Sequence, residues 1–213
     1  EKFKPKEFDD VKVLWFHVMP EGLLHTKTKP VEKLEDIQGL KLRCFGSNAK
    51  FVGLLGGAPV AMPMPEVYDA LAKGVVDGLM SSCEALQGFR TGEHIKYTTD
   101  NQNTAFGAAF VVMMNKKTWA SLPPNVQKIV DEMSREYVEK YGKMWSDINA
   151  AGREWLVQRG VKIISLSPEE QARWFDKGAR PLVDAYIKDM KAKGLPGEEA
   201  VSFLLEASKR HRK

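Results

Sequence analysis

The chain has 213 residues, of which 43% are hydrophobic and 28% are charged, and its formal net charge is +4. This is ordinary globular composition, and the length allows one large domain or two modest ones. The basic residues are interspersed with acidic ones rather than gathered on one element, which disfavours a nucleic-acid partner. No apolar run approaches the roughly 18 residues that a transmembrane helix needs.

The first forty residues are rich in β-forming side chains. Residues 11–16 predict a strand, and residues 23–31 predict a second extended segment that Pro30 closes. The first strand directly follows a charged stretch, with no earlier element to pair with. Because a strand needs a partner, we expect further chain in front of residue 1. The sequence begins without a signal-peptide pattern, so we expect any secretory leader to have been removed or to lie outside it.

Residues 40–90 alternate between short strands and helices. Pro65 and Glu66 are typical of a helix start, and Gly74 of a helix end. Ser47 or Asn48 is expected to cap the first helix. We predict strands, each followed by a helix, at residues 40–45, 59–62 and 75–80. This βαβαβα succession predicts a parallel sheet that is covered by helices, and hence an α/β fold.

The strongest helical pattern follows a predicted strand at residues 108–114. Apolar residues recur at helical spacing from about residue 124 to residue 159. At about 1.5 Å per residue, such a helix is on the order of 50 Å long, so it must be kinked or cross between two domains. Beyond it we expect a strand at residues 161–166, a helix from Ser167 that Pro181 interrupts, and a last helix to about Lys209.

Ligands of open parallel sheets bind beyond the carboxyl ends of the strands. If the three predicted strands are neighbours, their ends converge at one rim: Arg43-Cys44-Phe45, Met62-Pro63-Met64 and Met80-Ser81-Ser82. The rim then presents one cation, bulky apolar groups and hydroxyls, next to the start of a helix that Ser81 or Ser82 can cap. This chemistry suits a small organic anion, whose carboxylate Arg43 would bind through two nitrogens.

Each of these residues also has a purely structural explanation. An arginine on a strand is often solvated or paired with a surface carboxylate. Phe45, Met62 and Met64 are of the type that packs in a core, and the two serines are good helix caps whether or not they touch a ligand.

No pattern indicates catalysis, a metal or a cofactor. The sequence has no nucleophile elbow, zinc motif or phosphate-binding loop. The four histidines are scattered, and Cys83 and His94 do not form a recognisable nucleophile–base motif. Cys44 and Cys83 neither form a metal cluster nor establish a disulfide. We therefore expect no catalytic residue, no metal and no cofactor.

Four segments follow one another in a distinctive order: LEDIQGLKLR at residues 34–43, PVAMPMPEVYDAL at 59–71, GVVDG at 74–78 and WASLPP at 119–124. With these segments the chain resembles the solute-receptor subunits of tripartite ATP-independent periplasmic (TRAP) transporters. The resemblance implies a two-domain, type II periplasmic-binding-protein-like α/β fold braced by the long helix. It also implies a monomeric periplasmic receptor that is not an enzyme, and that hands an organic acid to integral-membrane permease subunits.

The resemblance also implies a division of the chain. Family members carry more sequence in front of a strand like residues 11–16, so most of a first domain is expected to be missing. We expect four parts: a remnant of the first α/β domain with a hinge strand (1–30), the second α/β domain with the hinge return (31–115), the long domain-spanning helix (116–160), and a C-terminal strand with helices that pack on the domains (161–213).

The family's ligand-binding arginine corresponds to Arg43. The family aromatic near the second helix falls on Met64, a frequent asparagine contact on Ser81, and a second basic contact on Lys29. Serine reaches less far than asparagine, and methionine gives an adaptable apolar wall. These departures indicate an apolar or aromatic monocarboxylate rather than a sugar acid. The candidate binding residues are Arg43, Phe45, Met64, Ser81, Ser82 and Lys29.

Three other classes remain as alternatives. A cytoplasmic effector-binding domain of a regulator would need a helix-turn-helix in front, which residues 1–16 do not provide. An α/β enzyme would need a nucleophile–base pair. A helical interaction protein would not need the βαβ region.

Overall fold

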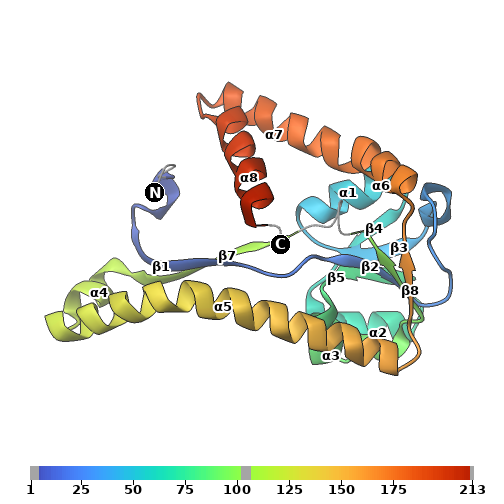
Figure 1. The fold of residues 1–213 in the computed structure, drawn as a ribbon, viewed down its shortest axis with the longest axis horizontal. Coiled ribbons are helices and arrows are strands. Elements are labelled where there is room, and N and C mark those ends of the chain that lie inside the picture. Colours follow the sequence, from blue (N-terminus) through green and yellow to red (C-terminus); the bar gives the residue numbers. More distant parts are fainter. Residues whose placement is uncertain (1–4, 102–106, 212–213) are drawn as a thin grey trace.

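The computed structural model describes residues 5–101 and 107–211, and it contains two β structures joined by one long helix (Figure 1). The larger, here called the main sheet, has the strand order β4-β3-β5-β2-β6-β8. Its strands are β2 (Leu23–Thr26), β3 (Lys41–Cys44), β4 (Ala58–Ala61), β5 (Gly78–Ser81), β6 (Tyr97–Asp100) and β8 (Lys162–Ser165). The smaller, here called the ladder, pairs β1 (Val11–Val18) with β7 (Ala109–Asn115) in antiparallel fashion.

The main sheet is mixed rather than wholly parallel. Strands β4, β3 and β5 are parallel neighbours, as predicted, and β6 is parallel to β8. Strand β2 lies between β5 and β6 and runs antiparallel to both. The predicted extended segment at residues 23–31 is therefore a strand only as far as Thr26. The strand expected at residues 75–80 starts later, at Gly78, and Val76 ahead of it is buried in a core.

Both faces of the main sheet are buried. On one face, Leu42 and Met80 pack with Phe51 of α1 (Ser47–Leu55) and Trp174 of α6 (Pro168–Trp174). On the other face, Leu79 packs in a second core with α2 (Val67–Ala72), α3 (Cys83–Gly88) and the C-terminal end of α5. Alternate residues of one strand thus enter different cores, as the pleat of a strand requires.

Helix α1 does not begin as expected. Its N-cap is Gly46, whose positive φ of 59° is one that glycine adopts without strain, and no side chain caps the helix. The prediction of a Ser47 or Asn48 cap is therefore wrong. The helix does end at Gly56, whose φ of 102° is typical of a C-terminal glycine.

Helix α5 (Pro124–Gln158) is a single element of 35 residues that runs from the ladder to the main sheet, preceded by α4 (Lys116–Ser121). At the ladder, the ring of Trp15 lies 5.6 Å from Tyr137 and 5.5 Å from Tyr141. At the main sheet, an added Cβ on Gly152 would lie 2.7 Å from the backbone of Cys83, so the two helices α5 and α3 touch backbone to backbone. The sequence predicted that this helix is either kinked or crosses between two parts of the molecule, and α5 does extend from the ladder to the main sheet.

The C-terminal segment continues through a π turn (Phe175–Ala179), α7 (Arg180–Ala192) and α8 (Gly197–His211). Pro181, expected to interrupt a helix, lies in the first turn of α7, directly after the π turn.

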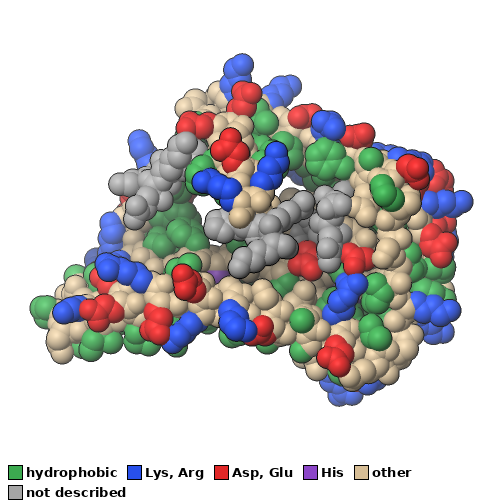
Figure 2. All heavy atoms as spheres, in the orientation of Figure 1, with side chains coloured by type: hydrophobic (Ala, Val, Ile, Leu, Met, Phe, Trp, Pro, Cys, Tyr) green, Lys and Arg blue, Asp and Glu red, His purple; other side chains and the backbone are tan. Residues whose placement is uncertain are grey.

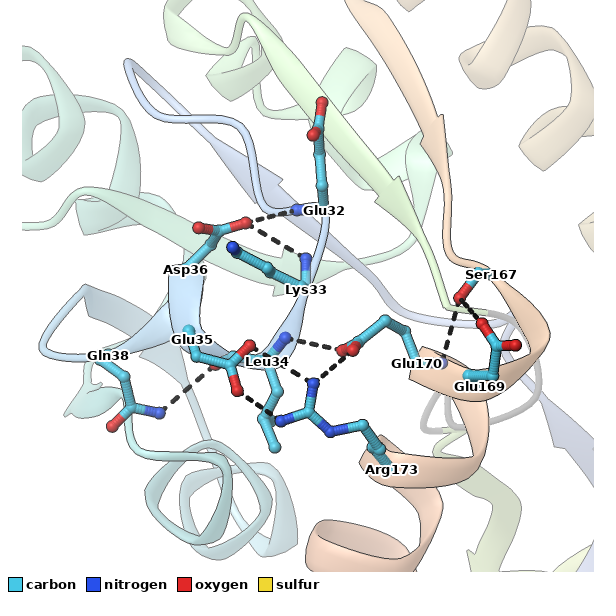
Figure 3. Close-up of polar contacts among 10 residues, drawn as sticks. All are labelled: Glu32, Lys33, Leu34, Glu35, Asp36, Gln38, Ser167, Glu169, Glu170 and Arg173. Carbon is cyan, nitrogen blue, oxygen red and sulfur yellow. Dashed lines mark hydrogen bonds and ion pairs between the residues drawn. The ribbon is translucent and has the colours of Figure 1, made fainter.

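Figure 3 shows the polar contacts between α6 and the 3₁₀ turn Leu34–Ile37. Arg173 forms ion pairs with Glu35 and Glu170, and the Glu170 carboxylate accepts the Leu34 N–H at 2.8 Å. The hydrogen bond from Arg173 lowers the pKa of Glu35.

The surface carries charges of both signs in mixture. Figure 2 shows acidic and basic side chains interspersed along α5 and the outer helices, where several form pairs four residues apart, such as Lys140 with Glu136 and Lys143 with Asp147. Within the described ranges, no helix is long and apolar enough to cross a membrane.

Candidate functional site

The carboxyl ends of β4, β3 and β5 meet at one rim of the main sheet. Arg43 lies beside Val60 on β4 and beside Leu79 on β5, so the convergence expected from the sequence is present. Arg43 and Leu79 face the side of the sheet that holds the second core, whereas Leu42 and Cys44 face the first. The alternation of the strand thus places the Arg43 side chain on the face opposite to the core that contains Phe51 of α1.

Arg43 is a buried basic side chain. It is 8% exposed, and its Nε donates a hydrogen bond to the Met62 carbonyl at 3.0 Å. Its Cζ lies 5.9 Å from the centre of the Phe45 ring. Among residues 5–101 and 107–211, no carboxylate forms an ion pair with it. Burial lowers the pKa of Arg43, but a guanidinium group keeps its charge in proteins.

A hollow of about 440 Å³ opens in front of this arginine, and we call it the Arg43 hollow. It is lined by Arg43, Phe45, Ala61, Met62 and Pro63. Phe45 is 54% exposed, so its ring is available for contact instead of packing in a core. The hollow therefore combines one positive charge with an apolar wall, which is the chemistry of a site for a small apolar anion.

Met64, Ser81 and Ser82 lie at the same rim but outside the residues that line the Arg43 hollow. Met64 is half-buried in the 3₁₀ turn Met64–Glu66, against the second core. Ser81 is buried at the end of β5, where its carbonyl accepts a hydrogen bond from His25. Ser82 is the buried N-cap residue of α3, and its hydroxyl has no hydrogen-bond partner in the part of the chain that the structure describes.

The N-terminus of α3 is capped from another helix. The side chain of Asn149 on α5 accepts the Cys83 N–H at 2.9 Å, whereas neither Ser81 nor Ser82 makes a side-chain cap. The expectation of a serine cap is thus wrong, because the close approach of α5 at Gly152 brings an amide into the capping position.

The structure separates Lys29 from the other candidates. Because β2 is antiparallel to β5, the last residue of β2, Thr26, lies beside the first residue of β5, Gly78. This end of the strands is opposite to the end at which Ser81 lies. Lys29 follows this end, is exposed, and donates to the Asp36 carbonyl at 3.0 Å. The structure therefore does not bring Lys29 together with Arg43, and a role of Lys29 in binding stays a prediction.

A second hollow at the rim involves residues that the sequence did not single out as a site. It has a volume of about 430 Å³ and lies between the connection from β1 to β2 and helix α5. Its lining includes Glu21, Trp145, Asn149 and Arg153. Trp145, Asn149 and Arg153 are spaced by four residues, so they share one face of α5. In the sequence, the four-residue spacing of the polar Asn149 and Arg153 could have indicated this face.

Both cysteines are buried and free. Burial raises the pKa of Cys44, and it raises the pKa of Cys83 to about 12, which leaves both thiols protonated and poorly nucleophilic. Among the residues described, no group of three His, Cys, Asp or Glu side chains is placed to hold a metal ion.

Comparisons with known proteins agree with this architecture. Residues 2–189 match the model of the family described as bacterial extracellular solute-binding protein, family 7. The outer membrane transporter protein TsaT of Comamonas testosteroni is 25% identical over 202 residues, which are 94% of this chain and 60% of that protein.

Two solved structures are similar over almost the whole chain. One is a marine metagenome TRAP solute-binding protein, specific for aromatic acid ligands and in complex with metahydroxyphenylacetate; it is 28% identical, with a TM-score of 0.89, over 98% of this chain and 66% of its own. The other is a TRAP solute-binding protein from Rhodoferax ferrireducens in complex with copurified benzoate; it is 30% identical, with a TM-score of 0.87, over 97% of this chain and 66% of its own.

The chain thus spans about 60 to 66% of the length of these relatives. The predicted α/β class, the periplasmic-binding-protein-like architecture and the long helix are confirmed, whereas the four-part division of the chain stays a prediction. The matched family consists of transport proteins and is not an enzyme family. On the strength of the family match over residues 2–189, the chain belongs to family 7 of the bacterial extracellular solute-binding proteins, the solute-binding proteins of TRAP transporters.

Proposed function

We propose that this chain is the ligand-binding part of an extracytoplasmic receptor that binds a small organic monocarboxylate through Arg43 and delivers it to a TRAP permease. The observation that carries the proposal is the buried guanidinium group of Arg43 at the rim of the main sheet, which pairs with no carboxylate of the described residues. A buried charge is costly unless it is paired. The described part of the chain offers Arg43 no carboxylate, so an anionic ligand would supply the missing partner.

The hydrogen bonds of Arg43 favour a carboxylate. Its Nε is occupied by the Met62 carbonyl. The two terminal nitrogens remain for the planar, two-point contact that a carboxylate makes with arginine. Since the Arg43 hollow offers one such cation, a ligand with one carboxylate fits it best.

The rest of the hollow favours an apolar or aromatic ligand. Phe45 and Met62 give an apolar wall next to the charge, and Met64 adds a flexible side chain at the same rim. The relatives that carry metahydroxyphenylacetate and benzoate support this ligand class.

Transfer to a membrane permease and a periplasmic location belong to the same proposal. They are supported by the family, which is described as extracellular, and by the structural relatives, which are TRAP solute-binding proteins. The family match favours a receptor over the cytoplasmic regulator domain considered as an alternative.

Titration calorimetry of the 213-residue chain with benzoate, metahydroxyphenylacetate and glucuronate tests the proposal. We expect the two aromatic acids to bind in preference to the sugar acid. Arg43→Ala should weaken benzoate binding at least about 30-fold, because the carboxylate loses a charged two-point partner. Arg135→Ala, at an exposed position of α5, is the matched control and should leave binding unchanged. Equal benzoate affinity in both variants, or a preference for glucuronate, would contradict the proposal.

A further inference from the structure

The second hollow, between the β1–β2 connection and α5, lies on the same rim as Arg43. Leu23, the first residue of β2, pairs with Ser81, the last residue of β5, so Glu21 lies at the carboxyl rim of the sheet. In the strand order, β5 separates β2 from β3. At the usual spacing between strands, Glu21 and Arg43 thus belong to strand ends about 10 Å apart.

One wall of this hollow is held in place by three hydrogen bonds. On α5, Trp145 donates to His17 of β1 at 3.0 Å, and Asn149 accepts from the backbone of Cys83 at 2.9 Å. Arg153, one turn further along, donates to Asp100 of β6 at 2.7 Å. Each bond reaches a different element of the fold, so the wall is fixed before any ligand arrives. A preorganised wall lowers the entropy that binding costs.

The opposite wall carries a carboxylate, that of Glu21. Glu21 is half-buried and forms no hydrogen bond or ion pair within the described residues, whereas the only guanidinium group of this lining, Arg153, is already paired with Asp100. Among the charges that act on the neighbouring Cys83 thiol, that of Arg153 is the largest, and those of Glu21, Glu84 and Asp100 oppose it. The hollow thus presents, among the described residues, one carboxylate that lacks a partner, since the charge of Arg153 is paired with Asp100.

We propose that this second hollow is an ammonium-binding subsite, in which Glu21 accepts hydrogen bonds from the N–H groups of a ligand. Trp145 supplies an aromatic surface, which also attracts an ammonium group. The ammonium can belong to a separate amine or to the far end of the carboxylate ligand held by Arg43. The second of these sources rests on the proposed function, and the first does not.

Three probes distinguish the two sources in titration calorimetry of the full chain. Benzylammonium carries the cation alone, 4-methylbenzoate carries the carboxylate alone, and 4-(aminomethyl)benzoate carries both. The variant Glu21→Gln removes the charge and keeps the shape of the side chain. Glu139→Gln, at an exposed position of α5 away from the hollow, is its matched control.

If one ligand fills both hollows, 4-(aminomethyl)benzoate should bind about tenfold more tightly than 4-methylbenzoate, and Glu21→Gln should remove that advantage. If the amine is separate, benzylammonium should bind, and Glu21→Gln should weaken it about tenfold while Glu139→Gln does not. The subsite is overturned if the unaltered chain shows no advantage for the aminomethyl compound and no binding of benzylammonium, or if Glu21→Gln changes neither.

The outcome for the subsite is separate from the outcome for Arg43. Loss of 4-methylbenzoate binding in Arg43→Ala supports the proposed function whatever the ammonium probes do. Binding of benzylammonium that depends on Glu21 but not on Arg43 supports the subsite even if the carboxylates fail to bind.

Discussion

The main sheet and the ladder are stabilised in different ways. The main sheet is buried on both faces, by one core that includes Trp174 and another that includes Leu79, and both side chains are 0% exposed. The ladder rests on α5 through aromatic ring contacts, and it exposes Phe16, Val18 and Met113. Because burial of apolar area dominates folding, the main sheet should carry most of the stability, and the ladder should depend on a few contacts along α5.

The strongest test of this difference is a large truncation in each region. Trp174→Ala should lower the free energy of unfolding by about 3–5 kcal/mol, because it removes a fully buried ring that packs on Phe51. Phe110→Ala in the ladder should cost about 1 kcal/mol or less, since that ring is 43% exposed. Urea unfolding measures both; equal losses would mean that the two regions are stabilised alike.

The second test uses the buried histidine of the main sheet. Burial, assisted by the charge of Arg153 and opposed by the Ser81 carbonyl, lowers the pKa of His25 from 6.5 to about 4. The unfolded chain therefore takes up a proton at a higher pH than the folded chain does. The free energy of unfolding should fall as the pH drops from about 6.5 to about 4, by on the order of 3 kcal/mol from this group.

The measurement is the free energy of unfolding as a function of pH, for the unaltered chain and for His25→Asn. The variant should lose the part of the slope that lies between pH 6.5 and 4. The same slope in both proteins would show that His25 is not the group responsible.

The third test concerns the join between α5 and the main sheet. Asn149→Ala removes the side chain that caps α3 and should lower the free energy of unfolding by about 1–2 kcal/mol, since the buried Cys83 N–H loses its partner. Ser146→Ala is the control, because the Ser146 hydroxyl donates its hydrogen bond within α5, to the Gly142 carbonyl. Thermal unfolding that does not separate the two variants would argue that the cap adds nothing.

The smallest effect is expected in the ladder. Lys12 and Asp131 form an ion pair of 2.7 Å with side chains that are 29% and 40% exposed. A double-mutant cycle with Lys12→Met and Asp131→Asn should give a coupling energy of about 0.5 kcal/mol, because solvent screens the pair. A coupling above about 2 kcal/mol would place this contact among the main supports of the ladder.

Local patterns predicted the parts of the fold that local chemistry determines. The helix pattern from residue 124 to 159 corresponds to α5, which ends at Gln158. Ser167 caps α6 as expected, accepting the Glu170 N–H at 3.2 Å. Arg43 and Phe45 both line the Arg43 hollow; Arg43 lies on β3, and Phe45 directly follows its last residue, Cys44, so the end of one strand predicts their proximity.

The parts that were missed depend on contacts between distant segments. The antiparallel direction of β2 leaves no mark in its own sequence, and it is this direction that carries Lys29 away from the rim. The close approach of β2 is reflected only on its partner strand β5, by a glycine. A Cβ on Gly78 would lie 2.1 Å from the His25 carbonyl. Glu21 meets α5 only through tertiary packing, so no spacing within the sequence could have joined it to Arg153.

The backbone contact at Gly152 has a mechanical consequence for α5. The contact lies 6 residues from the last residue of the helix and 28 residues from the first, at Pro124. At about 1.5 Å per residue, these two arms measure about 9 Å and about 42 Å. Any tilt of the helix about this fulcrum would move the ladder end more than four times as far as the sheet end. A small adjustment beside Cys83 would thus become a large displacement of β1 and β7.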